Sequence, residues 1–594
     1  MPRGHGGGDP IGLLANDANS CPLGKLARMK PLHRAPFRRV PGVACFVLGA
    51  LSVSSGLAQV QAQATPSAPS APTPAATAAP AAAVPTFDVL EFAVEGNTVL
   101  PVAAVEQAVT PFMGPGKTIG DVEAARAALE KAYQDAGFLT VFVDLPEQST
   151  AEGVIRLSVL EGRIERLAVT GSRYFSQGRI RQSVPELSEG KVPNFNVVQA
   201  QLADVNRTDD RRVQPVLRPG HNPGEVEAEL QVTDKLPLHG TVELNNNHAQ
   251  FTRPWRLQTA LHYDNLFQSD NSLTFMAITA PQNPSSSKVF SLEYAVPTGG
   301  GNSWRYSALY SDSNVDALGA ATILGKGYDV GIKRQLALPG TPTLNHSLTL
   351  GADYKDNKES TLAGNDSIYT PVRYIPFNMD YTGFLQWEDG GLSSLNALTV
   401  FGFKQLMKHN HDCGFGYADQ FECKRSGADG GFAYLRLDAR HSQPIKNWHV
   451  DVRVGGQMAT QALLGAEQYA LGGPDSVRGY LSAEAVGDNG MSGSLEVHTP
   501  NLLSSAAGAD ASSKPWWGPS EGHLYAFADA GRVRTINASA GQTAVQTLAS
   551  TGLGFKVKTY RYSNLTLEWA LPLKDGTATQ ARHPHMHMAL GVEF

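Results

Sequence analysis

The C-terminal stretch HMHMALGVEF, residues 585–594, decides how the second half of this chain is interpreted. Successive side chains of a β-strand point to opposite faces, so every second residue shares a face. One face is large and apolar and is made of Met586, Met588, Leu590, Val592 and Phe594. The other face carries His587, Ala589, Gly591 and Glu593. This pattern predicts a strand with one side in contact with lipid.

The same two-residue alternation recurs from about residue 237 to the end of the sequence. It is clear in WRYSALY (304–310), HSLTLGADY (346–354) and NLTLEWAL (564–571). About sixteen such segments follow one another, joined alternately by short turns such as LPGTP (338–342) and by longer loops. Strands in lipid cannot leave backbone groups unpaired, so they must close into a ring. Residues 236–594 are therefore predicted to form a membrane all-β barrel of about sixteen antiparallel strands.

A soluble all-β array, such as a propeller or a sandwich, also contains many short strands. Three observations favour the barrel: signs of export, strands of about ten residues, and an amphipathic last strand that stops on an aromatic residue. The mean hydropathy is −0.21. No run of about twenty apolar residues exists, so a helical membrane protein is excluded. With 49 Lys and Arg against 55 Asp and Glu, and a net charge of −6, no nucleic-acid partner is predicted.

Residues 1–64 have the composition of an export signal. Basic residues between positions 25 and 39 precede the short apolar run Val43–Val53, and Ala62-Gln63-Ala64 offers small residues for cleavage. A membrane anchor is the competing interpretation, but the run is too short to span a bilayer. Met29 is an alternative start. The Pro, Ala, Ser and Thr composition of residues 65–85 predicts a flexible linker.

Residues 86–234 contain an imperfect internal repeat. The first copy, 86–162, opens with FDVLEFAVEGNTVL (87–100), and the second, 163–235, opens with RIERLAVTGSRYF (163–175). Gly96 and Gly171 occupy equivalent turns after the first strand. Each copy then shows two helical segments and two strands, so both are predicted to be small β-α-α-β-β domains. Edge strands of such small sheets are able to bind an extended peptide by backbone pairing.

Four cysteines divide into two pairs by position. Cys21 and Cys45 lie in the expected signal, whereas Cys413 and Cys423 remain in the exported part, in HDCGFGYADQFEC. An exported chain meets an oxidising compartment, so these two are predicted to form a disulfide across a surface loop. The neighbouring His409, His411 and Asp412 offer a competing metal site, but polar loops rich in such residues are usually hydrated, and no metal site is predicted.

The segment ALGGPDSVRGYLSAEAVGDNG, residues 470–490, places Arg478 alone among glycines and turn-formers between two strands. An exposed arginine with no special role and a catalytic arginine are the competing interpretations. No nucleophile motif, zinc-protease motif, phosphate-binding loop or Cys-x-x-Cys pair accompanies it. The sequence therefore predicts neither an enzyme nor a cofactor.

Two small repeats followed by a barrel with LGGPDSVRGY resemble the transporter half of two-partner secretion systems, the ShlB/FhaC/HecB type of haemolysin secretion and activation protein. The same superfamily contains the outer-membrane assembly factor BamA. The resemblance covers residues 86–594, with 86–162 and 163–235 as POTRA domains. It implies that Val477, Arg478, Gly479 and Tyr480 tip a sixth extracellular loop, at about 466–489, that folds into the lumen. Arg478 then contacts Asp529 of a wall motif that consists of Phe527, Asp529 and Gly531.

The resemblance implies an outer-membrane translocator that moves one large unfolded exoprotein, such as a haemolysin or an adhesin, to the cell surface without nucleotide hydrolysis. The POTRA domains would lie in the periplasm, and the barrel would contact lipid and act as a monomer. The expected receptor residues in the second repeat are Val213, Val216, Leu217, Val226, Leu230 and Val232. An insertase for outer-membrane proteins and a plain diffusion porin remain alternatives, and a barrel lipase lacks its nucleophile motif. The proline content of 65–85 argues against the plug helix that some members carry, although Ala75–Ala83 could form a short one.

Overall fold

The structure is a computed structural model that describes residues 85–149, 152–250, 252–313, 326–358, 360–363, 366–369, 371–413, 416–503, 519–538, 541–559 and 563–594. The expected signal, the linker, the alternative start at Met29 and the question of a plug helix lie outside these residues. Among the described residues, no helix is both long and apolar enough to cross a membrane.

The first α/β unit is a three-stranded sheet in the order β2-β5-β4, with a separate β1-β3 pair, covered by two helices. Helix α2 begins at a capping box, in which the Thr118 hydroxyl accepts from Asp121 N–H while the Asp121 carboxylate accepts from Thr118 N–H. Its apolar stripe, which includes Leu129 and Tyr133, is fully buried against the sheet. The elements are β1 Phe87–Val89, β2 Glu91–Glu95, α1 Val102–Val109, η1 Thr110–Phe112, β3 Gly114–Lys117, α2 Ile119–Asp135, β4 Val141–Asp144 and β5 Val154–Glu161.

The second unit repeats this plan with a sheet in the order β6-β8-β7. Its core gathers residues from all of its long elements, among them Ile164, Ile180 and Leu230. The elements are β6 Arg163–Thr170, α3 Gln177–Ser183, η2 Pro185–Leu187, α4 Phe195–Val205, β7 Arg211–Pro219 and β8 Glu225–Asp234. Apart from the additional β1-β3 pair in the first unit, both units have the β-α-α-β-β order that the sequence predicts.

The topology corrects one prediction about the receptor strands. Strand β8 is central, parallel to β6 on one side and antiparallel to β7 on the other, so it has no free edge. Val226, Leu230 and Val232 therefore cannot pair with a partner backbone. Leu230 and Val232 are instead buried in the core, as is Val213 of β7. Alternation in the sequence indicates a strand but not its position in the sheet. The sequence therefore could not show that β7 is an edge strand and β8 the central one.

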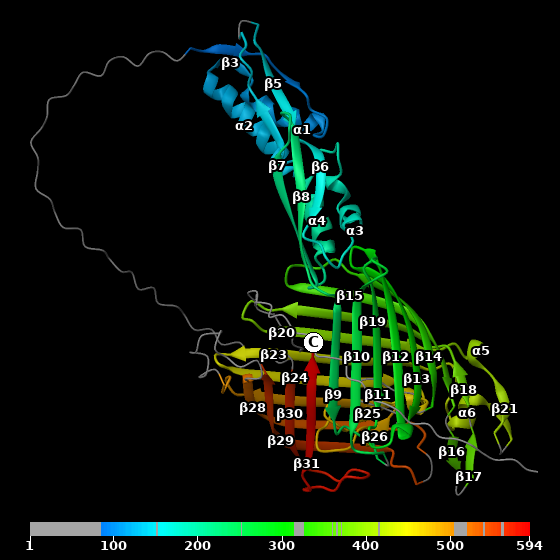
Figure 1. The fold of residues 1–594 in the computed structure, drawn as a ribbon. Helices are drawn as coiled ribbons and strands as arrows, with labels where there is room; N and C mark the ends of the chain where they lie inside the picture. The colour runs from blue at the N-terminus through cyan, green and yellow to red at the C-terminus, as the bar shows by residue number, and fades with distance from the viewer. Residues whose placement is uncertain are drawn as a thin grey trace, which may run out of the picture. The chain divides into compact units, whose positions relative to one another are not determined.

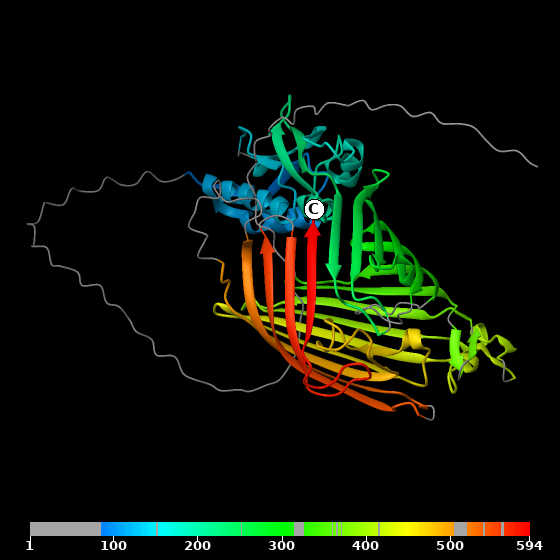
Figure 2. The same ribbon diagram turned by 60° about the horizontal axis from the view of Figure 1, so that its bottom comes forward.

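Sixteen long strands then form one closed antiparallel barrel, in which the last strand β31 pairs with the first strand β9 (Figure 1). The three-residue β18, Val372–Tyr374, extends the pairing of β15. The view in Figure 2 shows the red last strand beside the green first strands of the barrel. The long strands are β9 Leu238–Asn245, β10 Arg256–Leu266, β11 Asn271–Thr279, β12 Ser287–Gly299, β13 Asn302–Ser313, β14 Lys326–Ala337, β15 Leu344–Asn357, β19 Phe377–Gln386, β20 Leu392–Phe401, β23 Ala433–Ile445, β24 Trp448–Ala459, β27 Asn489–His498, β28 Pro519–Arg534, β29 Val545–Thr559, β30 Ser563–Pro572 and β31 His585–Glu593.

The strand faces follow the alternation of the sequence. In β31, Met586 is 56% exposed on the outer surface while His587 is 4% exposed in the interior. Trp304 of β13 and Trp569 of β30 are also exposed outward. A closed ring removes every free strand edge, which is the condition for a sheet to lie in lipid. The predicted barrel is therefore confirmed, with one apolar face outside.

The connections also alternate in length. On the side where the chain enters β9, turns such as 300–301 and 446–447 are short, with 499–518 as a long exception. On the opposite side, the fifth and sixth loops are long: loop 5 is 402–432 and loop 6 is 460–488. Loop 5 contains α5 Lys404–Met407, β21 Asn410–Asp412, β22 Tyr417–Asp419 and α6 Gln420–Lys424, and loop 6 contains η4 Gly465–Glu467, β25 Tyr469–Leu471 and β26 Ala485–Gly487.

Candidate functional site

Loop 6 folds into the barrel and places its tip among the inward side chains. Val477, Arg478 and Tyr480 are 0%, 3% and 0% exposed, although they belong to a loop. Gly479 has φ +87°, a region that side chains rarely adopt, and a Cβ there would lie 3.2 Å from Ala570 Cβ on β30. Glycine at this position therefore allows both the turn and the close approach to the wall.

Arg478 binds Asp529 of β28 through two parallel contacts. Its Nε lies 2.7 Å from Asp529 Oδ2 and its Nη2 lies 2.7 Å from Oδ1, while the Arg478 backbone N–H donates to Oδ2 at 3.0 Å. The Cζ atom lies 3.7 Å from the centroid of the Phe527 ring, a cation–π contact. Gly531 provides space, because a Cβ there would lie 2.7 Å from Leu471 Cδ1 of loop 6. Each of the three wall-motif residues thus contacts or accommodates the loop.

Two further carboxylates, which the sequence did not single out, surround the same guanidinium. Arg478 Nη1 lies 2.6 Å from Glu496 Oε1 of β27 and 3.0 Å from Glu568 Oε1 of β30, and Nη2 donates to Ser494 Oγ at 2.9 Å. Tyr525 donates its hydroxyl to Glu568 at 2.7 Å. We call Arg478 with Asp529, Glu496 and Glu568 the arginine clamp. It joins loop 6 to three different strands of the wall.

The neighbours of Arg478 add contacts on other strands. Gly479 N–H donates to His587 Nε2 of β31 at 2.9 Å. The Tyr480 hydroxyl lies 2.9 Å from the Ala549 carbonyl oxygen of β29 and 2.8 Å from that of Lys574. The loop tip is therefore fixed to β27–β31, the last part of the barrel.

The two ends of loop 6 have anchors of their own, also missed from the sequence. Glu467 is 2% exposed, with Lys355 Nζ at 2.7 Å and the Tyr374 and Tyr434 hydroxyls at 2.6 and 2.7 Å. Asp488 accepts two contacts from Arg425 of loop 5, at 2.6 and 2.7 Å. The partners of Glu467 and Asp488 are tyrosines, a lysine and an arginine at ordinary strand and loop positions. Nothing in the local sequence distinguishes such residues as anchors of the loop. Only the closed barrel brings these distant residues to the loop.

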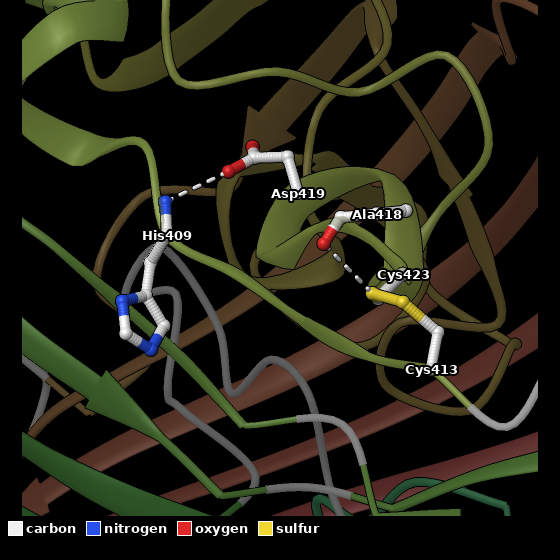
Figure 3. Close-up of a disulfide and its surroundings, with 5 residues drawn as sticks. All are labelled: His409, Cys413, Ala418, Asp419 and Cys423. Atoms are coloured by element: carbon white, nitrogen blue, oxygen red, sulfur yellow. Dashed lines mark hydrogen bonds between the residues drawn. A yellow bond between two sulfur atoms is a disulfide. The ribbon is translucent and has the colours of Figure 1, made fainter. Parts of the chain in front are cut away.

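Loop 5 carries the cysteine pair. Cys413 and Cys423 are joined by a disulfide with a Cα–Cα distance of 5.4 Å (Figure 3). Beside it, the His409 backbone N–H donates to Asp419 at 2.9 Å, and the imidazole points away from the sulfur atoms (Figure 3). Among the described residues, His409 and Asp412 belong to none of the three groups whose donor atoms lie close enough together to share an ion.

A profile of the haemolysin secretion/activation proteins ShlB/FhaC/HecB matches residues 224–557. The chain belongs to this family. A profile of the ShlB-type POTRA domain matches residues 87–162, which is the first α/β unit. The barrel is thus an outer-membrane barrel with its POTRA region in the periplasm, and the short-turn side, where β9 begins, faces the periplasm. The family consists of outer-membrane transporters of two-partner secretion, which work with a secreted partner.

Three curated relatives are each described as an outer membrane transporter CdiB. The chain is 25% identical over 429 residues to the outer membrane transporter CdiB of Escherichia coli, covering 68% of each chain. It is 28% identical over 181 residues to CdiB of Escherichia coli O6:K15:H31 (strain 536 / UPEC), covering 30% of each. CdiB of Dickeya dadantii (strain 3937) is 22% identical over 364 residues, 60% of this chain and 62% of that one. The chain thus spans from under a third to about two thirds of the length of these relatives.

Solved structures share the fold. CdiB from Escherichia coli has a TM-score of 0.57 at 20% identity, over 88% of this chain and 93% of that one. CdiB from Acinetobacter baumannii has a TM-score of 0.53 at 14% identity, over 86% and 90%. BamA from Haemophilus ducreyi lacking POTRA domains 1-3 has a TM-score of 0.50 at 15% identity, over 86% and 100%. At such identities the likeness concerns the fold alone.

Proposed function

We propose that this chain takes one large exoprotein in extended form from the periplasm and passes it through the barrel lumen to the cell surface, without nucleotide hydrolysis. The observation that carries the proposal is the buried tip of loop 6, held inside a closed barrel by the arginine clamp. Among the described residues, the contacts of the tip are hydrogen bonds, ion pairs and packing contacts, which allow the tip to leave the lumen and return. An entering polypeptide would exchange its own polar groups for those of the loop.

The clamp also distinguishes this function from a diffusion porin. A porin needs neither α/β domains in the periplasm nor an arginine of a loop bound to the inner wall of its barrel. The insertase alternative places the work at the lipid face instead of the lumen. Transport of a chain through the lumen requires movement of loop 6, whereas diffusion past a fixed loop does not.

Partner capture, in this proposal, centres on one end of β7. Prolines at 215 and 219 carry no N–H, and Val213 N–H already donates to the Asn206 side chain at 2.6 Å. Every second backbone N–H of β7 faces away from β8, and between 213 and 219 these are the positions 213, 215, 217 and 219. With two of them prolines and Val213 already bonded, Leu217 N–H is the donor of this set that a partner could use. Extended backbone pairing along the whole strand is therefore weak, which narrows the expected receptor to the neighbourhood of Leu217.

An apolar groove adjoins Leu217 and supplies the remaining binding surface. It is lined by Leu139, Phe142 and Leu160 of the first unit and by Leu217, Pro219 and Val226 of the second. Leu139 and Phe142 are 53% and 58% exposed. Large exposed apolar side chains that gather in one place mark a surface for a partner. We assign this groove to apolar side chains of the unfolded exoprotein.

Deletion of residues 164–234 tests the proposal. The partner is first identified as the large protein that disappears from the cell surface when this chain is removed. We expect the deletion variant to insert as a folded barrel, judged by its heat-modifiable migration on gels, and to export that partner poorly. Undiminished surface export by a correctly inserted variant would contradict capture by the second unit. Loss of other outer-membrane barrels from cells without this chain would favour the insertase alternative.

A further inference from the structure

Four inward side chains on two neighbouring strands form a second group, which shares Glu496 with the arginine clamp. His449 and Asp451 lie on β24, and Glu496 and His498 lie on β27. The register pairs His449 with His498 and Asp451 with Glu496. Since residues two apart share a face of a strand, all four side chains point into the same part of the lumen. The positions lie at the start of β24 and the end of β27, which is the periplasmic rim of the barrel.

The donor atoms of Asp451, Glu496 and His498 all lie within 4.8 Å of one another, close enough to share a metal ion, and His449 adjoins this group through Asp451. His449 Nε2 lies 3.1 Å from Asp451 Oδ1, and His498 Nε2 lies 3.2 Å from Asp451 Oδ2 and 2.8 Å from Glu496 Oε2. Zinc bonds of roughly 2.0 to 2.1 Å in a tetrahedron set neighbouring ligand atoms about 3.3 Å apart. Small shifts of Asp451, Glu496 and His498 would therefore bring their atoms to bonding positions, and a larger movement of His449 would add a fourth ligand.

The surroundings hold the ligands in place. The ring of His498 stacks on that of Tyr525 at a centroid distance of 4.6 Å, and Ser442 donates to Asp451 Oδ1 at 2.5 Å. Within the described residues, the ion pairs of Asp451 are with His449 and His498, and none is with a lysine or arginine. Glu496 is shared, since Arg478 lies 2.6 Å from its Oε1 and Lys556 Nζ lies 3.6 Å from its Oε2. The positive charges of Arg478 and Lys556 repel a metal ion, and because both lie beside Glu496, they do so more at Glu496 than at Asp451.

We propose that Asp451, Glu496 and His498 bind a divalent transition-metal ion of the zinc class, with His449 as the fourth ligand. Two imidazoles with two carboxylates suit such an ion better than calcium or magnesium, which prefer oxygen ligands throughout. The ion would tie β24 to β27, the two strands that loop 6 connects. Through Glu496 it would also contact the arginine clamp, so the metal would stabilise the wall to which the loop is bound.

Zinc titration of the untagged full chain in detergent tests this proposal. We expect one equivalent of Zn²⁺ to bind the wild type, and Co²⁺ to give the visible absorption of a four-coordinate site. H449Q/H498Q should weaken Zn²⁺ binding by more than the roughly 10- to 100-fold that loss of an outer-shell partner causes. The matched control is H346Q/H441Q, whose rings contact the Tyr381 and Ser393 hydroxyls, and it should bind as the wild type does.

Two other groups of closely spaced donor atoms among the described residues are competing candidates for a metal site, and they contain His221 and His239. Binding that persists in H449Q/H498Q and disappears in H221Q/H239Q would overturn the proposal, as would a wild type that binds no Zn²⁺. Heat-modifiable migration of each variant shows that the barrel has formed. A variant Asp451→Asn, which keeps the shape of the side chain but removes its charge, should lose affinity as well; unchanged affinity would overturn the assignment of Asp451.

Discussion

Arg478 of loop 6 and Asp529 of β28 meet through two parallel contacts of 2.7 Å, and both side chains are almost fully buried, at 4% and 0% exposure. A planar guanidinium fork matches both oxygens of a carboxylate, which a lysine ammonium cannot do. The pair therefore fixes the orientation of the loop as well as its distance from the wall. Removal of one partner leaves the other charge buried without compensation.

The first prediction concerns the clamp itself. Arg478→Met should lower the free energy of unfolding by about 3 to 5 kcal/mol, the usual cost of breaking a buried ion pair from one side. Arg440→Met is the matched control, because Arg440 is 45% exposed and pairs with Asp438, and it should cost less than about 1 kcal/mol. Denaturant unfolding in detergent measures both. Equal effects of the two substitutions would contradict a buried clamp.

The same clamp predicts a second effect, on conductance. Without Arg478 the tip of loop 6 loses its contacts with Asp529, Glu496 and Glu568, so it should leave the lumen more often. In planar bilayers, Arg478→Met should show more frequent large openings than the wild type, and Arg440→Met should not. Identical opening statistics for Arg478→Met and the wild type would show that the clamp does not hold the pore closed.

The space at Gly531 gives a third prediction. Gly531→Val places a side chain where Leu471 of loop 6 now packs, since even a Cβ would lie 2.7 Å from Leu471 Cδ1. Overpacking of this kind costs about 1 to 3 kcal/mol. Leu471→Ala should relieve the clash, so the double variant should be more stable than Gly531→Val alone. If the two substitutions instead add without coupling, Gly531 and loop 6 do not pack together.

The barrel was predictable because alternation and strand number follow from the sequence alone. Arg478 and Asp529 were found through motifs that resemblance supplied. Glu496 and Glu568 were not found, because many strands carry an acidic residue on their inward face. Only closure of the barrel brings β27 and β30 to the same guanidinium. Glu467 and Asp488 were missed for the same reason, since their partners Lys355 and Arg425 lie 112 and 63 residues away. The central position of β8 depends on long-range pairing and had no local signal.

The disulfide of loop 5 supports a fourth prediction. Closing a loop of about ten residues removes about 2 to 3 kcal/mol of entropy from the unfolded segment. C413S/C423S should therefore open loop 5 more often and loosen the contact between Arg425 and Asp488. Trypsin cleavage after Lys424 or Arg425 should accelerate roughly 30- to 150-fold if it follows the open population. Reductant should give the wild type the same sensitivity and leave the variant unchanged; a wild type unaffected by reductant would contradict this role.

The groove beside Leu217 carries the last prediction. Leu139→Ser with Phe142→Ser should reduce surface export of the partner, because both side chains are more than half exposed and offer apolar area to an unfolded chain. Since they are not part of the buried core, the folding of the first unit should change little. Val197→Ser is the matched control: Val197 is 43% exposed on α4 and does not line the groove. Binding of the purified α/β region, residues 86–235, to unfolded partner should fall in parallel with export. If export falls while that binding is unchanged, or if Val197→Ser has the same effect, the groove is not the capture surface.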